Sequence, residues 1–146
     1  MRGGRLHSGV LARGLRDALE RLGARVRTEY PVRPGRGAGA VDLYAELGGT
    51  RVAIEVELGV RRVRQDIRKA EALGVDTLVI VTPTPKVAAL ALRYVRTQTQ
   101  SSVRVHVLPF GRALAFLSQV FGVDSRQDTK SESGSSRTRS RTERVE

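Results

Sequence analysis

The stretch AVDLYAELGGTRVAIEVEL, residues 40–58, decides the fold of this chain. Two runs in which apolar and polar side chains alternate, residues 40–47 and 50–58, flank Gly48 and Gly49. A pair of glycines between alternating runs is a strong signal for a two-residue hairpin turn, because such turns need residues that tolerate positive φ. The stretch therefore predicts two antiparallel strands joined by a tight turn.

The turn also fixes which residues face one another across the hairpin. With the two glycines in the turn, the partners have residue numbers that sum to 97, so Asp42 lies opposite Glu55. Glu57 shares the face of Glu55, because strand side chains alternate. The other face is apolar in three successive pairs: Val41 with Val56, Leu43 with Ile54, and Ala45 with Val52. Three carboxylates are thus expected at one end of the hairpin, above an apolar surface that can pack.

The segments around the hairpin alternate between helical and strand periodicity. Apolar side chains at helical spacing predict helices over about residues 7–22, 60–73, 86–97 and 112–121. Further strands are predicted over about residues 25–32, 77–81 and 103–108. The run at 77–81, TLVIV, is almost wholly apolar, as expected of a strand buried on both faces. The order α-β-β-β-α-β-α-β-α predicts an α/β fold, with a mixed central sheet flanked by helices.

Length and composition indicate one folded domain followed by a tail. The chain has 146 residues and no cysteine, which fits a single core without disulfides. Residues 122–146 are rich in Ser, Thr, Arg and Glu, so we expect a disordered tail after a domain at 1–121. No apolar run approaches the roughly 20 residues of a membrane span, and no signal core follows Met1. We therefore expect a cytoplasmic protein that does not associate with membranes.

The charge of the chain points to a polyanionic partner. The net charge is +11, and residues 1–121 carry 20 Lys and Arg against 10 Asp and Glu, so the excess belongs to the predicted domain. A compact domain with such a surplus attracts phosphate backbones, and nucleic acid is the expected partner. The alternative from charge alone is a basic surface that serves only solubility.

The carboxylates at the end of the hairpin require a positive partner. Directly opposed like charges destabilise a pair of strands, so Asp42 facing Glu55 with Glu57 beside them calls for a divalent cation or for basic side chains. Asparagine and cysteine are absent, and His7 and His106 are far from the cluster in sequence, so the available ligands are oxygens. Mg²⁺ or Mn²⁺ fits such a set best. The alternative is a solvated strand face whose charges the many arginines balance.

These residues resemble a known family. The order of elements over residues 7–108, with Asp42 on the second strand and Ile54-Glu55-Val56-Glu57 on the third, is similar to that of the PD-(D/E)xK nucleases. The resemblance implies a restriction-endonuclease-like αβββαβ core. It also implies Mg²⁺-dependent hydrolysis of phosphodiester bonds, with DNA as the expected substrate and a homodimer as a possible assembly.

The motif is carried over residue by residue. Asp42 and Glu55 match the two acidic residues, and the resemblance implies that they bind metal together with the backbone carbonyl of Val56. Glu57 stands where the family has a lysine that orients or helps deprotonate the attacking water. Lys69 on the following helix is a candidate to replace that lysine, and Glu29 on the first strand is a further candidate metal ligand. Glu57 is itself a candidate second metal ligand or general base.

The expected substrate contacts lie on the helix after the hairpin. If the resemblance holds, the side chains that bind the flanking phosphates are Arg61, Arg62, Arg64, Gln65 and Arg68. The small size of the domain favours structure-selective or partner-directed cutting. One alternative is a catalytically inactive member of the fold that binds nucleic acid or assembles with a DNA-processing complex, because the motif lysine is missing. The other is an unrelated basic α/β binding protein, which the 4% aromatic content disfavours, since few base-stacking side chains are present.

Overall fold

The computed structural model describes residues 2–32, 39–97 and 101–122, with side chains from residue 8 onward. It contains four helices and five strands in the predicted order within these residues. The helices are α1 (Arg2–Arg21), α2 (Val63–Leu73), α3 (Pro85–Thr97) and α4 (Phe110–Val120). The strands are β1 (Arg25–Pro31), β2 (Ala40–Leu47), β3 (Thr50–Val56), β4 (Thr77–Thr82) and β5 (Arg104–Pro109). The predicted tail lies outside the described residues, apart from its first position.

The five strands form one mixed sheet in the order β1-β2-β3-β4-β5. β1, β2 and β3 pair antiparallel, whereas β3, β4 and β5 pair parallel. The change of direction at β3 follows from the connections, because a tight turn joins antiparallel neighbours while parallel neighbours need a crossover such as α2 or α3. The predicted α/β fold with a mixed sheet is therefore confirmed.

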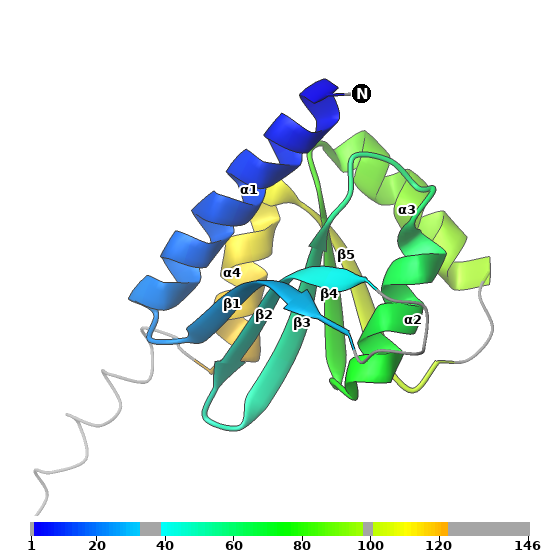
Figure 1. Cartoon of the computed structure of the whole chain (residues 1–146). Helices are drawn as coiled ribbons and strands as arrows, with labels where there is room; N and C mark the ends of the chain where they lie inside the picture. Colours follow the sequence, from blue (N-terminus) through cyan, green and yellow to red (C-terminus); the bar gives the residue numbers. More distant parts are fainter. Residues whose placement is uncertain (1, 33–38, 98–100, 123–146) are drawn as a thin grey trace, which may run out of the picture.

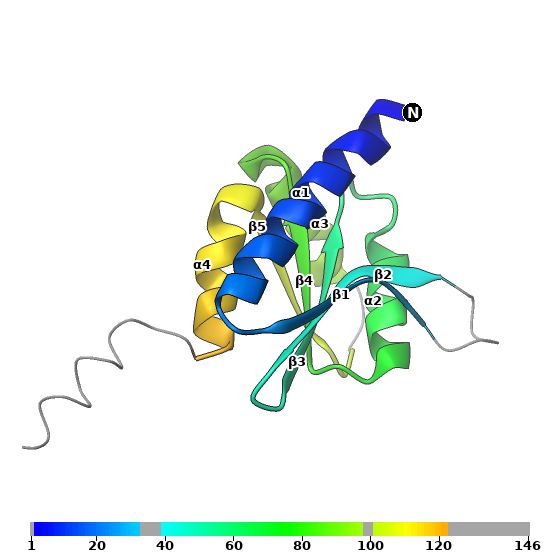
Figure 2. The same ribbon diagram turned by 60° about the vertical axis from the view of Figure 1, so that its left-hand side comes forward.

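Helices cover both faces of the sheet, so the molecule has three layers (Figure 1). α1 and α4 lie side by side on one face, and α2 and α3 cover the other (Figure 2). β4 contributes to both cores, because Val79 and Val81 pack under α1 and α4 while Leu78 and Ile80 pack under α2 and α3. The prediction that this strand is buried on both faces is confirmed. None of the described helices has the length and apolar character to cross a membrane.

The hairpin register is as predicted up to the point where the strands separate. Gly48 and Gly49 have φ of 58° and 86°, and the ladder runs from Leu47 opposite Thr50 to Leu43 opposite Ile54. Glycine suits this turn because other L-residues are strained at positive φ. Beyond Leu43 the backbone ladder stops, so Asp42 and Glu55 are not joined by a regular pair of strand hydrogen bonds.

One expected face assignment is wrong. Val41 packs with Ala53 in the core under α2 and α3, whereas Val56 packs in the core under α1 and α4. The reason is that β2 is distorted at Asp42: its ladder with β3 has ended, and its ladder with β1 omits the pair of Asp42 and Glu29. Glu29 has a φ of 49°, in the left-handed region, which interrupts the regular alternation of β1. The alternation of side chains between the two faces of β2 is therefore broken at Asp42, and Val41 lies on the opposite face from Leu43.

The third strand is shorter than predicted. It ends at Val56 rather than near residue 58, so Glu57 follows the strand instead of lying within it. The Glu57 N–H donates to the Val81 carbonyl at 2.9 Å, which keeps this residue against β4. Glu57 is thus held next to the end of the hairpin where Asp42 and Glu55 lie.

Candidate functional site

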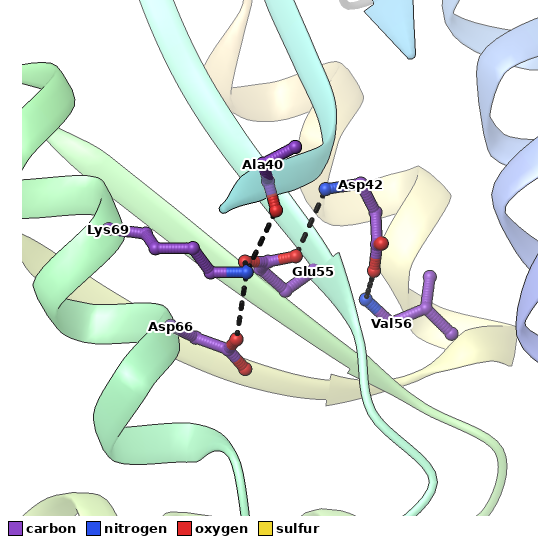
Figure 3. Close-up of polar contacts among 6 residues, drawn as sticks. All are labelled: Ala40, Asp42, Glu55, Val56, Asp66 and Lys69. Carbon is purple, nitrogen blue, oxygen red and sulfur yellow. Dashed lines mark hydrogen bonds and ion pairs between the residues drawn. The ribbon is translucent and has the colours of Figure 1, made fainter. Parts of the chain in front are cut away.

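At the open end of the hairpin, the Asp42 and Glu55 carboxylates accept hydrogen bonds from backbone N–H groups of the opposite strand. The Asp42 N–H donates to Glu55 Oε1 at 3.0 Å, and the Val56 N–H donates to Asp42 Oδ2 at 2.7 Å (Figure 3). Each carboxylate is therefore fixed by the backbone of the opposite strand. Charge-assisted hydrogen bonds of this kind are stronger than neutral ones, so the two acidic groups are held in defined positions.

Lys69 provides the positive charge that these carboxylates require. Its Nζ lies 2.6 Å from Glu55 Oε2 and donates to the Ala40 carbonyl at 2.9 Å, so it joins α2 to both strands of the hairpin (Figure 3). The sequence made Lys69 a candidate to lie beside the hairpin carboxylates, and the structure places it there. Val63, Ile67 and Ala70 anchor the buried face of α2 and so direct Lys69 toward the strands.

Burial and the contact between Glu55 and Lys69 shift the pKa of both side chains. Glu55 is 2% exposed, and this burial raises its pKa to about 7; the Asp42 charge also raises it, while the Lys69 ammonium opposes the shift. Burial alone would lower the pKa of Lys69. The hydrogen bond to Glu55 and the charges of Glu55, Asp66 and Asp42 outweigh that effect, so the pKa of Lys69 is raised above its ordinary value. Lys69 is therefore a stable ammonium at neutral pH, which can donate hydrogen bonds but cannot accept a proton.

Asp66 is a site residue that the sequence analysis missed. It is 1% exposed, and its Oδ1 lies 3.7 Å from Lys69 Nζ. Burial and the neighbouring carboxylates of Glu57 and Glu55 raise the pKa of Asp66 far above its usual range. A signal was present in the sequence, because Asp66 occupies the apolar stripe of α2 formed by Val63, Ile67 and Ala70.

A cavity of about 740 Å³ opens over these groups. It forms where β2 and β3 separate, so helices from both faces of the sheet reach it. Its acidic and basic lining residues are Arg13, Arg16, Glu29, Asp42, Glu55, Glu57, Arg62, Asp66 and Lys69. The cavity therefore brings Glu29, Glu57 and Lys69 together with Asp42 and Glu55.

The basic wall of the cavity differs from the predicted one. Of the predicted substrate contacts on and before α2, Arg62 and Gln65 line the cavity. Arg61, Arg64 and Arg68 are exposed and are not among its lining residues. α1 contributes two basic side chains that the sequence analysis did not select, Arg13 and Arg16. Nothing in the local sequence distinguishes these from other helix-surface arginines, because their role depends on how α1 packs across the sheet.

The acidic groups suit a hard cation in their chemistry, since all of their donor atoms are oxygens. Within the described residues, however, no group of three or more His, Cys, Asp and Glu side chains is arranged to hold a metal ion. Lys69 is the positive group that contacts Glu55 and Asp66. The arrangement thus combines oxygen donors with a fixed ammonium at the end of the hairpin.

Comparison with known proteins identifies the fold but not a family. No protein-family model matches the chain, and no curated protein matches it. Among solved structures, the chain is similar to one titled as the crystal structure of a protein of unknown function, AF1548, with a TM-score of 0.50 and 18% identity. The match covers 69% of this chain and 58% of that one, so the chain spans less than two thirds of its length. At this identity the likeness shows the fold alone.

Proposed function

We propose that this protein is a metal-dependent nuclease that hydrolyses phosphodiester bonds in DNA. The observation that carries the proposal is the position of Lys69, whose Nζ lies 2.6 Å from Glu55 in the cavity that Asp42 also lines. In the PD-(D/E)xK pattern a lysine accompanies two acidic residues, and here α2 supplies the lysine that Glu57 replaces in the motif. The site thus has the three side-chain types that the pattern needs, from different elements.

Each residue has a proposed role. Asp42, Glu55 and the Val56 carbonyl bind Mg²⁺ or Mn²⁺, with Glu29 at the edge of the same cavity as a further oxygen donor. An ion held there would supply a water of lowered pKa and positive charge beside the scissile phosphate. Lys69 stays protonated and donates hydrogen bonds to the negative charge that develops in the transition state. Glu57 accepts the proton of the attacking water.

The substrate is proposed to lie between α1 and α2. Arg13 and Arg16 line the cavity from α1, and Arg62 and Gln65 line it from the α2 side. Guanidinium groups bind phosphate oxygens in a bidentate manner, so two basic walls on either side of the acidic groups would hold a strand on both sides of the scissile bond. Contacts with phosphates carry no sequence information, which favours structure-selective or partner-directed cutting.

A second candidate function is a catalytically inactive member of the fold that binds nucleic acid. It is favoured by the ion pairs that Lys69 makes with Glu55 and Asp66, and by the lack of a three-ligand metal group among the described residues. In this alternative, Lys69 neutralises the carboxylates permanently, and the arginines of the cavity bind phosphates without cleavage.

A cleavage assay tests the proposal. Duplex, single-stranded and branched DNA are incubated with the full chain and Mg²⁺ or Mn²⁺, with EDTA as the metal-free comparison. We expect metal-dependent cutting of at least one substrate, and a loss of roughly a hundredfold or more in Asp42→Asn, Glu55→Gln and Lys69→Met. The matched controls are Asp76→Asn and Lys86→Met, whose side chains are exposed and do not line the cavity. Melting curves check that each variant is folded.

The outcomes separate the alternatives. Binding to every substrate without cutting by the native chain would favour the inactive nucleic-acid-binding subunit. Cutting that survives both Asp42→Asn and Glu55→Gln would show that the chemistry takes place elsewhere in the chain.

A further inference from the structure

Two tyrosines stack on each other outside the cavity of the candidate site. Tyr30 on β1 and Tyr44 on β2 have ring centroids 4.5 Å apart and an interplanar angle of 17°. The guanidinium carbon of Arg27 lies 5.9 Å from the centre of the Tyr30 ring, within reach of a cation–π contact. The chain has three tyrosines, three phenylalanines and no tryptophan, so two of its few aromatic side chains meet beside an arginine at this point.

The two tyrosines line a hollow near the edge of the sheet. Its volume is about 130 Å³, and Arg25, Arg27 and Glu46 complete its lining. β1 is the first strand in the order of the described sheet, so the hollow lies beside an edge strand. It is far smaller than the cavity of about 740 Å³ over the hairpin carboxylates. A hollow of this size suits a single planar group rather than a folded polymer.

Glu46 lies between two arginines of the neighbouring strands but pairs with neither. Arg25 is directly opposite it on β1, yet the two side chains form no ion pair among the described residues. Arg51 is opposite it on β3 and donates to the Gly74 carbonyl instead. Opposite charges in such positions usually stabilise a sheet by contacting each other. The Glu46 carboxylate is therefore available to hydrogen-bond donors of a ligand in the hollow, and Arg25 to its acceptors.

We propose that this hollow binds an unpaired nucleobase and is a second nucleic-acid contact, separate from the cavity. Aromatic side chains stack on bases of any sequence, and arginine adds cation–π contacts and contacts with phosphates. The Glu46 carboxylate repels a phosphate but accepts hydrogen bonds from the N–H groups on the edge of a base. The group that enters the hollow is therefore the base, while the exposed arginines at its rim contact the backbone.

The position of the hollow indicates the kind of nucleic acid that would occupy it. Glu29 and Asp42 line the cavity, and in the chain they lie one residue before Tyr30 and two residues before Tyr44. The same two strands therefore carry both sites. A base inside a duplex is stacked and paired, so a single-stranded segment or an unpaired branch offers the free base. Cutting beside such a segment rests on the proposed nuclease function, whereas binding of the base does not.

A comparison of normal and abasic DNA tests this inference. A labelled duplex with a single-stranded overhang is compared with the same duplex whose overhang lacks its bases, by fluorescence anisotropy in EDTA. Both DNAs carry the same phosphates, so the difference in affinity reports contacts with the bases. We expect the full chain to bind the overhang with bases roughly tenfold more tightly, as stacking of a base implies. Equal affinity of the native chain for the two DNAs would overturn the proposal.

Variants locate the preference for bases in the hollow. Tyr44→Leu removes the ring but keeps an apolar side chain against the core under α2 and α3, and it should abolish the preference. Tyr44→Phe keeps a ring and should retain it. Tyr94→Leu on α3, outside the lining of the hollow, is the matched control and should bind as the native chain does.

A second change covers the case in which Tyr44→Leu fails to fold. Arg27 is exposed, so Arg27→Gln should leave the fold intact and lower the ratio of the two affinities severalfold. A preference that survives in every folded variant of the hollow would overturn the assignment.

The binding result is independent of cleavage. A chain that prefers overhangs with bases but cuts no DNA in Mg²⁺ would contradict the proposed nuclease and leave the base-binding hollow standing. A chain that cuts DNA and binds both overhangs equally would do the reverse.

Discussion

Glu55 illustrates how one buried carboxylate links the stability of the protein to pH. Its side chain is almost fully enclosed, and its two oxygens accept from the Asp42 N–H and contact the Lys69 ammonium. Burial disfavours the charged form, and these contacts only partly offset that effect. The residue is therefore held in position at a cost that depends on its protonation state.

We predict that the chain loses stability as the pH rises through the range set by Glu55. Folding raises the pKa of Glu55 from 4.5 to about 7, so the folded state binds more protons than the unfolded state in this interval. The resulting stabilisation is fully present below pH 4.5 and is lost as the pH rises toward 7, an effect of about 3 kcal/mol at most. Urea unfolding at pH 5 and pH 8 measures it.

Glu55→Gln should remove this part of the pH dependence, because glutamine does not titrate. The exposed Glu71, changed to Gln, is the control and should keep the dependence of the native chain. An equal change of stability between the two pH values in the native chain and in Glu55→Gln would contradict the assignment.

At the scale of elements, the hairpin of β2 and β3 positions the candidate site. Its turn fixes the register, and its open end places Asp42 beside Glu55 after the backbone ladder has stopped at Leu43 and Ile54. The turn, which fixes the register, and the carboxylates, which form the site, lie at opposite ends of the hairpin. A change at the turn should reduce the stability of the hairpin without altering the chemistry at its other end.

We predict that Gly49→Ala destabilises the protein by about 1 kcal/mol, because position 49 has a φ of 86° and a side chain is strained there. A Cβ at this position would meet no described heavy atom within 4 Å, so the cost is conformational rather than steric. The free energy of unfolding in urea measures the effect. The cleavage or DNA-binding activity of the folded fraction should stay at the native level.

Gly59→Ala is the matched control for this change. A Cβ at Gly59 also meets no described heavy atom within 4 Å, and its φ is not in the left-handed region. Equal stability losses in the two variants would mean that the turn does not require glycine for its backbone conformation.

At the scale of the whole molecule, the three layers bring basic side chains to one cavity. α1 and α2 lie on opposite faces of the sheet (Figures 1 and 2). Residues of both helices line the cavity. A net charge of +11 attracts a polyanion to the whole surface, but the cavity concentrates arginines beside the acidic groups. Electrostatic binding to nucleic acid should therefore depend most on the residues of the cavity.

We predict that Arg13→Ala and Arg62→Ala each weaken DNA binding and make it less sensitive to salt. Each lost phosphate contact lowers the slope of log K against log salt concentration by about 1. Fluorescence anisotropy at several salt concentrations, without divalent metal, measures the slope. Arg93→Ala, an exposed position on α3 that does not line the cavity, is the control. A slope that falls equally in all three variants would indicate binding by net charge alone.

The sequence by itself determined the elements, their order and the hairpin register, because turn glycines, strand alternation and helical spacing act over short distances. The same local rules placed Asp42 opposite Glu55, whereas the resemblance to the nuclease motif made Lys69 a candidate. They did not reveal that β2 changes its alternation at Asp42, since that distortion arises from the separation of β2 from β3 and from the left-handed backbone of Glu29.

Only the tertiary structure decided which side chains share the cavity. It pairs Lys69 with Glu55 and brings Asp66 into the cavity that Glu57 also lines. It also makes Arg13 and Arg16, among many similar arginines, the ones on α1 that line this cavity. These contacts join residues far apart in the chain, and they depend on how α1 and α2 pack against the sheet. Periodicity reports the face on which a residue lies, but the distance between two charges, and therefore their pKa and their chemistry, is set by packing.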